Sequence, residues 1–293
     1  MATFLFGTSG GLYRSDGSLL DHRPVTHLAA GAAGPWGVLE DRDMATWDGE
    51  RWMPVASLTD HRPRCVLPLD DGALAGAADA RLYRVDARLA APVSSLDQAP
   101  TRGDWYTPWG GPPDTRSLSR GPAGTYANVH VGGILRSDDD ERWSPTAIDI
   151  DADVHQVLVD GDRVLAATAF GLAESPDRGA TWAFHADGLH ATYCRAVAVA
   201  GDAVLVSASR GHAGADAALY RWAGGAFERA REGLPAWFDD NIDTHCLAAE
   251  GTLAAAGTRD GRLFVSEDGG WSWTEAASGL PAVRAVCLAR LAG

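Results

Sequence analysis

Short apolar runs alternate with polar turns along the whole chain, and seven of these runs carry a histidine or an arginine near their start. Examples are V-H-Q-V-L at residues 154–158 and V-R-A-V-C at residues 283–287. These seven residues, the His/Arg column, follow one another at spacings of 37, 52, 39, 40, 50 and 39 residues. The column consists of His27, Arg64, Arg116, His155, Arg195, His245 and Arg284. A period near 40 residues, built from short strands, predicts a β-propeller with one blade per repeat.

Each repeat contains four short segments with strand character. The column run is followed by a turn, as at residues 160–162, and then by a second apolar run, as at residues 163–167. A third run such as L-F-V-S at 263–266 comes next, and a fourth carries Trp or Phe, as at Trp52. Gly, Asp and Pro at the junctions are turn chemistry, and no stretch has a long apolar period of 3.6 residues. We therefore predict an all-β chain with almost no helix.

The two ends of the chain complement each other. Residues 282–291 supply only an innermost strand, whereas residues 3–21 supply three outer strands without an inner one. Together they predict blade seven, formed by residues 1–21 and 282–293, within one domain spanning residues 1–293. The fold class is therefore a seven-bladed β-propeller with mixed N- and C-terminal closure of the last blade, which hides strand edges.

Two turns between third and fourth strands share the pattern S-x-D-x-G-x-[ST]-W. They are S-P-D-R-G-A-T-W at residues 175–182 and S-E-D-G-G-W-S-W at residues 266–273, with a degenerate copy at residues 137–143. This pattern resembles the Asp-box of the bacterial neuraminidase repeat (BNR), and the chain looks like a member of the sialidase-like BNR propeller superfamily. Asp and Ser would cap turn amides, and Gly would take a positive φ.

The resemblance implies a fold more firmly than an activity, because the superfamily includes sialidases, other glycosidases, sorting receptors and photosystem assembly factors. The sialidase motif Phe/Tyr-Arg-Ile-Pro is missing near the N-terminus. Asp-boxes in this family lie on the face away from the active site, which implies a structural role here. Sialidase-like chemistry would use a tyrosine nucleophile with a carboxylate base, such as Tyr193 with Asp153 or Asp243.

The amino-acid composition limits the class of protein and the kinds of partner that it can bind. A hydrophobic content of 46% excludes disorder, and the apolar stretches are too short and broken to span a bilayer. The N-terminus lacks the pattern of a signal peptide, so we expect a cytoplasmic bacterial protein. A net charge of −14 disfavours nucleic acid and anionic membranes as partners. The four cysteines form no CxxC pair and are expected to be reduced thiols.

The histidines of the column suggest metal chemistry. His27, His155 and His245 fall on blades one, four and six, so their imidazoles can converge on the axis as an open site for zinc, copper or iron. Asp153 and Asp243 each precede a histidine by two residues and are candidates to orient it or to move protons. His130, near the end of a second strand, is a spare ligand or a proton-transfer group.

The arginines of the column suggest an anion. Arg64, Arg116, Arg195 and Arg284 can hold a carboxylate or phosphate, so the expected ligand is a small anionic molecule. All cations are arginine, which excludes lysine chemistry. Two insertions lead into the column and carry aromatic residues that can wall a ligand. These aromatics are Trp105, Tyr106, Trp109, Trp237 and Phe238.

Three interpretations of the column remain open at this point: a three-histidine metal site, an anion pocket without metal, and a solvated channel with no ligand. The main functional hypothesis is a metal-dependent enzyme that acts on a small anionic substrate at the channel mouth. The alternatives are a sialidase-like glycoside hydrolase and a non-catalytic ligand-binding or assembly propeller. The sequence does not determine the oligomeric state, and a closed ring is compatible with a monomer.

Overall fold

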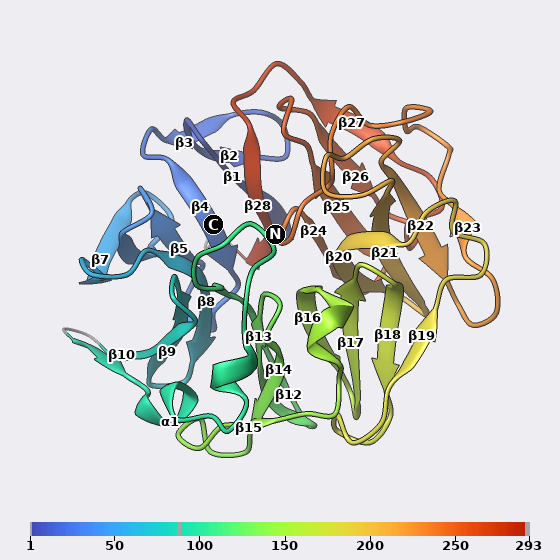
Figure 1. Ribbon diagram of the computed structural model, residues 1–293. Helices are drawn as coiled ribbons and strands as arrows, with labels where there is room; N and C mark the ends of the chain where they lie inside the picture. The colour runs from blue at the N-terminus through green and yellow to red at the C-terminus, as the bar shows by residue number, and fades with distance from the viewer. Residues whose placement is uncertain (1, 87–88, 291–293) are drawn as a thin grey trace.

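The computed structural model describes residues 2–86 and 89–290 as seven four-stranded antiparallel sheets around one axis (Figure 1). The prediction of a seven-bladed β-propeller is therefore confirmed. Helix is confined to single turns in loops, as expected from the absence of a 3.6-residue apolar period. These turns are α1 (Ser94–Asp97), η1 (Arg102–Asp104) and η2 (Ile150–Ala152).

The strands follow the chain from the axis outward in blades one to six. Blade one contains β4 (Val25–Ala29), β5 (Trp36–Leu39), β6 (Asp43–Trp47) and β7 (Trp52–Ser57). Blade two contains β8 (Pro63–Leu69), β9 (Gly72–Ala77), β10 (Arg81–Val85) and β11 (Ala90–Pro92). Blade three contains β12 (Thr115–Gly121), β13 (Gly124–Val129), β14 (Gly133–Ser137) and β15 (Ser144–Pro145).

The next three blades repeat this order. Blade four contains β16 (Val154–Asp160), β17 (Arg163–Thr168), β18 (Gly171–Ser175) and β19 (Ala183–His185). Blade five contains β20 (Tyr193–Ala200), β21 (Ala203–Ser209), β22 (Ala218–Trp222) and β23 (Glu228–Arg229). Blade six contains β24 (Leu247–Glu250), β25 (Leu253–Gly257), β26 (Leu263–Ser266) and β27 (Thr274–Ala277).

Blade seven combines the two ends of the chain. The strand β28 (Val283–Arg290) is innermost, and β1 (Ala2–Thr8), β2 (Gly11–Arg14) and β3 (Leu19–Asp21) lie outside it. The first and last of these strands in the chain, β1 and β28, pair antiparallel from one end to the other. Residues 1 and 291–293, which the sequence also assigned to this blade, lie outside the described residues.

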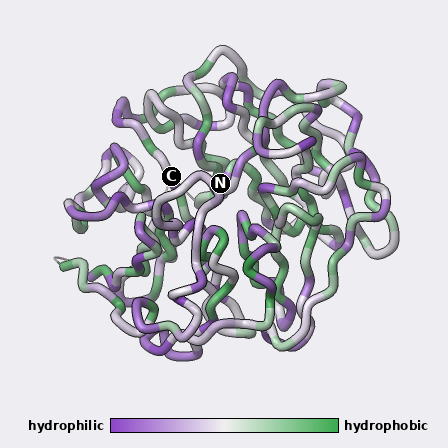
Figure 2. The backbone as a smooth tube through the Cα atoms, viewed as in Figure 1, coloured by the Kyte–Doolittle hydropathy of each residue, from purple (hydrophilic) through white to green (hydrophobic). Residues whose placement is uncertain are grey.

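The hydrophobic core lies between blades rather than in one central mass. Each buried cluster joins side chains of two neighbouring sheets, as where Leu205 and Leu219 of blade five pack with Phe264 of blade six. Figure 2 shows hydrophobic strands within the ring and hydrophilic loops at its edges. Because each sheet is covered on both faces, its strands read as nearly continuous apolar runs. This packing leaves the axis itself to the inner strands and their entry loops.

The serine- and aspartate-containing turns close on themselves as their sequence predicts. The hydroxyl of Ser175 accepts a hydrogen bond from the Gly179 amide at 2.7 Å and donates to Asp177 at 2.9 Å. The Asp177 carboxylate also accepts from the Thr181 amide at 2.8 Å. The turn that begins at Ser266 repeats these contacts. Both turns follow the third strand of a blade. The column residues lie where the first strand begins, so the turns are at the opposite end of the blade.

Replacing Ser175 with alanine should therefore destabilise the fold. The hydrogen bond from the Gly179 amide to this hydroxyl is buried. Without the hydroxyl, the buried amide would lose this side-chain acceptor. We expect Ser175→Ala to lower the free energy of unfolding by about 1–3 kcal/mol in urea titrations. The exposed Ser18→Ala variant is the control and should change it by less than about 0.5 kcal/mol. Equal stability of the two variants would contradict this structural role.

Candidate ligand-binding pocket at the channel mouth

A local irregularity of the inner strands aims the column residues at the axis. The pairing of inner and second strands skips one or two residues in five blades at the column position. Such a β-bulge leaves the extra residue out of the ladder and redirects its side chain. The bulges contain Arg64, Arg116, His155, Arg195 and Arg284.

In blade one the β-bulge lies one residue before the column residue. Its bulge falls on Thr26, whereas His27 pairs with Val38 within the ladder. A shift of one residue turns a side chain to another face of the strand. His27 is consequently buried between blades, where its Nδ1 accepts a hydrogen bond from the Val66 amide at 3.2 Å. His27 is therefore not among the described residues that line the pocket, and Thr26 takes its place there.

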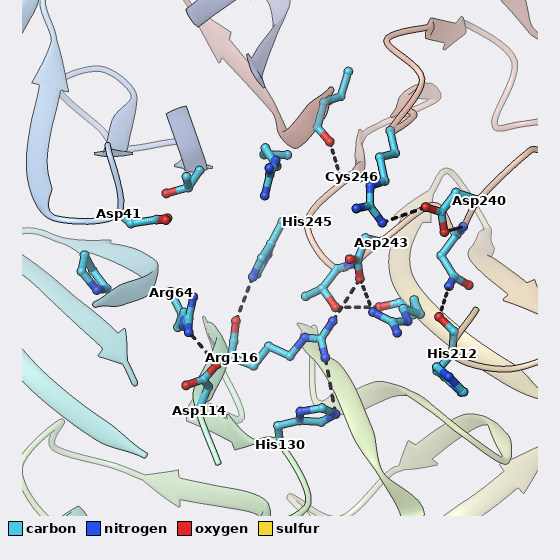
Figure 3. A pocket seen from close by; sticks show the side chains of 18 residues that line it. Asp41, Arg64, Asp114, Arg116, His130, His212, Asp240, Asp243, His245 and Cys246 are labelled. Atoms are coloured by element: carbon cyan, nitrogen blue, oxygen red, sulfur yellow. Dashed lines mark hydrogen bonds and ion pairs between the residues drawn. The ribbon is translucent and has the colours of Figure 1, made fainter. Parts of the chain in front are cut away.

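A polar pocket of about 430 Å³ opens at the channel mouth (Figure 3). All four column arginines line it, together with Thr26 and His245. Five arginines and four aspartates face the pocket, giving a formal net charge of +1 in a protein of net charge −14. The mouth is thus locally attractive to an anion. The arginines are Arg64, Arg116, Arg195, Arg259 and Arg284, and the aspartates are Asp41, Asp114, Asp240 and Asp243.

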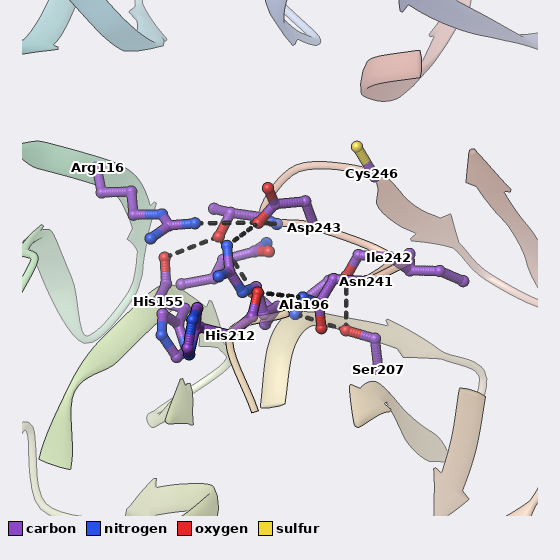
Figure 4. A network of polar contacts seen from close by, with 12 residues as sticks. Arg116, His155, Ala196, Ser207, His212, Asn241, Ile242, Asp243 and Cys246 are labelled. Carbon is purple, nitrogen blue, oxygen red and sulfur yellow. Dashed lines mark hydrogen bonds and ion pairs between the residues drawn. The ribbon is translucent and has the colours of Figure 1, made fainter. Parts of the chain in front are cut away.

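Three residues that precede the inner strand of blade six, residues 243–245, line the pocket and reach the inner strands of other blades. Figure 4 shows Asp243 within this network of polar contacts. The Thr244 hydroxyl lies 3.2 Å from the carbonyl oxygens of both His155 and Arg195. The His245 amide donates to the Gln156 side chain at 3.2 Å, and its Nε2 donates to the carbonyl of Arg116 at 3.0 Å. We call residues 243–245 the crossing segment. It separates the polar pocket from a second cavity of about 320 Å³ that the inner strands line with mainly apolar side chains.

Asp243 ties the crossing segment to two column arginines. Its Oδ1 accepts from Arg116 Nη2 at 3.0 Å and from Arg195 Nη1 at 2.9 Å, and it also accepts the Thr244 amide at 2.8 Å. Burial raises the pKa of Asp243, but the charges of Arg116 and Arg195 outweigh burial and hold that pKa well below its usual range. Arg64 forms a separate ion pair with Asp114 at 3.0 Å. Within the described residues, no carboxylate forms an ion pair with Arg284.

Four predicted residues form a second polar group beside the mouth, the His130 cluster, which comprises His130, Asp153, His155 and Tyr193. Asp153 lies 2.9 Å from His130 Nε2 and 3.4 Å from His155 Nε2. The Tyr193 hydroxyl lies 3.0 Å from the same His155 nitrogen. The positive φ of Asp153, 50°, directs the carboxylate between the two imidazoles. Among the described residues, the Tyr193 side chain contacts His155 and the Arg195 guanidinium rather than Asp153 or Asp243.

Burial controls the protonation of this cluster. It lowers the pKa of His155 to about 4, which leaves the imidazole neutral at neutral pH. It also raises the pKa of Asp153, but the close approach of the His130 and His155 rings outweighs that effect and holds the pKa well below its usual range. Burial raises the pKa of Tyr193, so the phenol stays protonated and is not an activated nucleophile. The sequence-based pairing of Tyr193 with a carboxylate base finds no support here.

The three column histidines do not gather. His27 and His245 are neighbours, with ring centroids 4.2 Å apart, but His155 belongs to the His130 cluster. In the part of the chain that the structure describes, the set whose ligand atoms all lie within 4.8 Å of one another is His130, Asp153 and His155. The structure therefore does not bring the three column histidines together, and the grouped side chains come from blades three and four.

The aromatic insertions place one residue beside His130 and four elsewhere, and none of the five is among the described residues that line the pocket. Trp109 is 68% exposed, and its ring centroid lies 5.2 Å from that of His130. The Tyr106 hydroxyl donates to Asp151 at 2.8 Å, and Trp105 packs partly buried against the core below blade three. Trp237 stacks on the Arg229 guanidinium, and Phe238 is buried. Only Trp109 among the predicted aromatics therefore adjoins the His130 side of the mouth.

Several pocket residues escaped the sequence reasoning. Asp41 and Arg259 lie in turns between second and third strands, and Asp240 pairs with Arg259 at 3.0 Å. These turns share the mouth face, because each second strand runs toward the end where the first began. The charged residues in the turns between second and third strands could have indicated these positions from the sequence. His212, in the loop that follows the second strand of blade five, also lines the pocket.

The cysteines near the column are buried and free, in keeping with the expected thiols. Burial raises the pKa of Cys65 and of Cys194 to about 12, so neither forms a thiolate at neutral pH. Cys246 lines the pocket, and burial raises its pKa as well. Nucleophilic cysteine chemistry is therefore disfavoured at this mouth.

The fold and the mouth define a β-propeller with a polar, arginine-lined channel entrance. No protein-family model matches the chain, and no curated protein matches it either. Among solved structures, YCF48 from Cyanidioschyzon merolae is 15% identical, with a TM-score of 0.62 over 91% of this chain and 95% of that one.

Two further structures are similar. YCF48 bound to D1 peptide is 14% identical, with a TM-score of 0.56 over 99% of this chain and 88% of that one. The Pan2 WD40 domain of Neurospora crassa is 12% identical, with a TM-score of 0.59 over 91% and 86% of the two chains. At these identities the likeness establishes the propeller fold alone. No helix within residues 2–86 and 89–290 is long and apolar enough to cross a membrane.

The buried histidine pair below the pocket should make stability fall in acid. Burial lowers the pKa of His245 to about 4 and that of His27 well below 6.5. Between about pH 6.5 and 4 the unfolded chain therefore binds more protons than the folded one, and the free energy of unfolding falls as pH drops. We expect His245 alone to account for about 2 kcal/mol between pH 7 and pH 4.5 in urea titrations.

His245→Gln should show a correspondingly weaker dependence on pH across this range. The exposed His22→Gln variant is the control and should follow the wild type. A pH dependence in His245→Gln equal to that of the wild type would show that His245 is not the titrating group.

Proposed function

We propose that the protein is a non-catalytic binding propeller that captures an anionic group, a carboxylate or phosphate carried by its partner, at the channel mouth. The observation that carries this proposal is the convergence of four column arginines on one pocket. Guanidinium groups bind both anions through paired N–H donors. Arg284 is the best-placed of the four, since it is exposed in the pocket and has no ion pair to a described carboxylate.

The partner is proposed to be a peptide segment with an acidic side chain or a free carboxylate. A structurally similar propeller, YCF48, has been solved with a D1 peptide bound. The present pocket, at about 430 Å³, is large enough for a few side chains of such a segment. A free small anionic molecule would use the same arginines and is the other form of ligand that the experiments below distinguish.

The turns at residues 175–182 and 266–273 support a relationship with BNR propellers, which we include in the proposal. Their hydrogen bonds are local and lie away from the mouth, so they contribute stability rather than ligand contacts. Sialidase chemistry has less support, because the Tyr193 hydroxyl faces His155 instead of a carboxylate. The cytoplasmic location expected from the sequence stays a prediction.

Removing one free guanidinium tests the anion pocket. We expect Arg284→Gln to weaken binding of succinate and of inorganic phosphate by about tenfold in isothermal titration calorimetry, since a charge-assisted hydrogen bond is lost. Asp243→Asn should have the opposite effect, because it releases Arg116 and Arg195 from their shared carboxylate. Binding should also weaken as salt rises.

Arg142→Gln provides the matched control. Arg142 is an exposed arginine paired with Asp139 in the turn on the opposite face, so its loss should leave anion affinity unchanged. Comparison of succinate with an acidic peptide of the same charge distinguishes a small ligand from a peptide partner. No saturable binding of any of these anions, or equal loss in Arg284→Gln and Arg142→Gln, would overturn the proposed function.

A further inference from the structure

Three metal-ligand side chains from two neighbouring blades meet at the edge of the pocket. His130 follows β13 of blade three, and Asp153 and His155 begin the inner strand of blade four. Their ligand atoms all lie within 4.8 Å of one another. We propose that His130, Asp153 and His155 bind a divalent transition-metal ion, a function separate from anion capture by the arginines.

The hydrogen bonds around His155 orient it as a ligand. Its Nδ1 lies 2.6 Å from the carbonyl oxygen of Cys194, which can only accept, so Nδ1 carries the proton. The lone pair of a neutral His155 is therefore on Nε2, the atom that faces Asp153 at 3.4 Å. Metal-ligating histidines commonly donate their second ring N–H to a backbone carbonyl in this way.

His130 presents its lone pair from the same nitrogen. Its Nε2 lies 3.4 Å from Nη1 of Arg116, a group that can only donate. The tautomer in which Nε2 accepts from Arg116 carries its proton on Nδ1, and this is the tautomer that a bound cation requires. Both imidazoles then direct lone pairs, rather than protons, toward the Asp153 carboxylate. A carboxylate and two lone pairs that face one another repel unless a cation or a proton lies among them.

One oxygen of Asp153 is left without a suitable donor. Its Oδ1 is fully covered by protein and forms no hydrogen bond of acceptable geometry, although His130 Nε2 is only 2.9 Å away. A buried carboxylate oxygen without a partner is costly, since burial removes the hydration that it has in water. A bound cation would satisfy this oxygen and both imidazole nitrogens together.

The separations also suit a coordination sphere. Two atoms at about 2.0–2.2 Å from one ion are about 2.9–3.5 Å apart at angles between about 90° and 109°. Asp153 Oδ1 lies 2.9 Å from His130 Nε2, and Asp153 Oδ2 lies 3.4 Å from His155 Nε2, so each carboxylate oxygen is at such a separation from one imidazole. Two imidazoles and one carboxylate favour zinc, iron or copper over calcium or magnesium, which prefer oxygen ligands alone.

The neighbouring charges oppose the ion only in part. Arg116 is the nearest cation, but its Nη2 is held by Asp243 at 3.0 Å, and Arg195 is held by the same carboxylate. The Tyr193 hydroxyl donates to His155 Nε2 and so competes with an ion for that lone pair. Loss of this hydroxyl should therefore preserve or strengthen metal binding, whereas loss of a ligand should abolish it.

Titration of the full-length protein with Zn²⁺ and Co²⁺ tests the site. We expect one equivalent to bind, with a visible Co²⁺ absorption band typical of a coordinated ion. His130→Gln and Asp153→Asn should each weaken this binding by about 100-fold or more, because even outer partners of metal ligands are worth 10–100-fold. Tyr193→Phe should bind at least as tightly as the wild type.

The controls separate this site from other histidines and from the anion pocket. His61→Gln removes a histidine remote from the cluster and should leave the titration unchanged. Arg284→Gln should also keep its metal affinity, whatever it does to succinate binding. Far-UV circular dichroism establishes that each variant is folded, and Asp153→Asn changes the less buried of the two side chains.

Absence of Zn²⁺ and Co²⁺ binding by the wild type would overturn the proposal. So would binding that His130→Gln and Asp153→Asn leave unchanged, since the ions would then occupy surface histidines. Weaker metal binding in Tyr193→Phe than in the ligand variants would assign the cluster to a hydrogen-bond network instead.

Discussion

The shared carboxylate of Asp243 is the contact on which the channel mouth depends. One oxygen holds Arg116 of blade three and Arg195 of blade five, although its own chain segment belongs to blade six. Because the three groups come from different blades, the ion pairs join sheets that share no backbone ladder. They also fix the crossing segment, whose Thr244 and His245 bond to blades three, four and five. A polar pocket above and an apolar cavity below follow from that single closure.

The pocket and the His130 cluster are adjacent but differ in the groups that they present. The column arginines supply positive charge within an acidic protein, while His130, Asp153 and His155 supply lone pairs and a carboxylate. Arg116 is common to both, since it contacts Asp243 through one nitrogen and His130 through another. Movement of Arg116 away from His130 would therefore alter the cluster, so this side chain couples the pocket to the His130 cluster.

Much of the fold could be predicted because each blade repeats a local solution. Turn residues, apolar runs and the two chain ends that share blade seven can each be recognised in a short stretch of sequence. The structure has the corresponding strands. The sequence identified many residues of the site, but it did not predict which of them lie close together. The four arginines meet at the mouth, but His27 does not, because a bulge one residue earlier turns it between blades. No local pattern distinguishes Thr26 from His27 as the bulged residue.

The sequence by itself therefore determined the number of blades, the closure of the ring and the supply of histidine and arginine at each inner strand, since these depend on period and local propensity. Only the tertiary structure decided which side chains face one another. The carboxylate of Asp153 joins His130 across a blade boundary, and the crossing segment spans the axis. Such contacts depend on bulge position, loop path and the angle between sheets, which are set by packing among blades far apart in the chain.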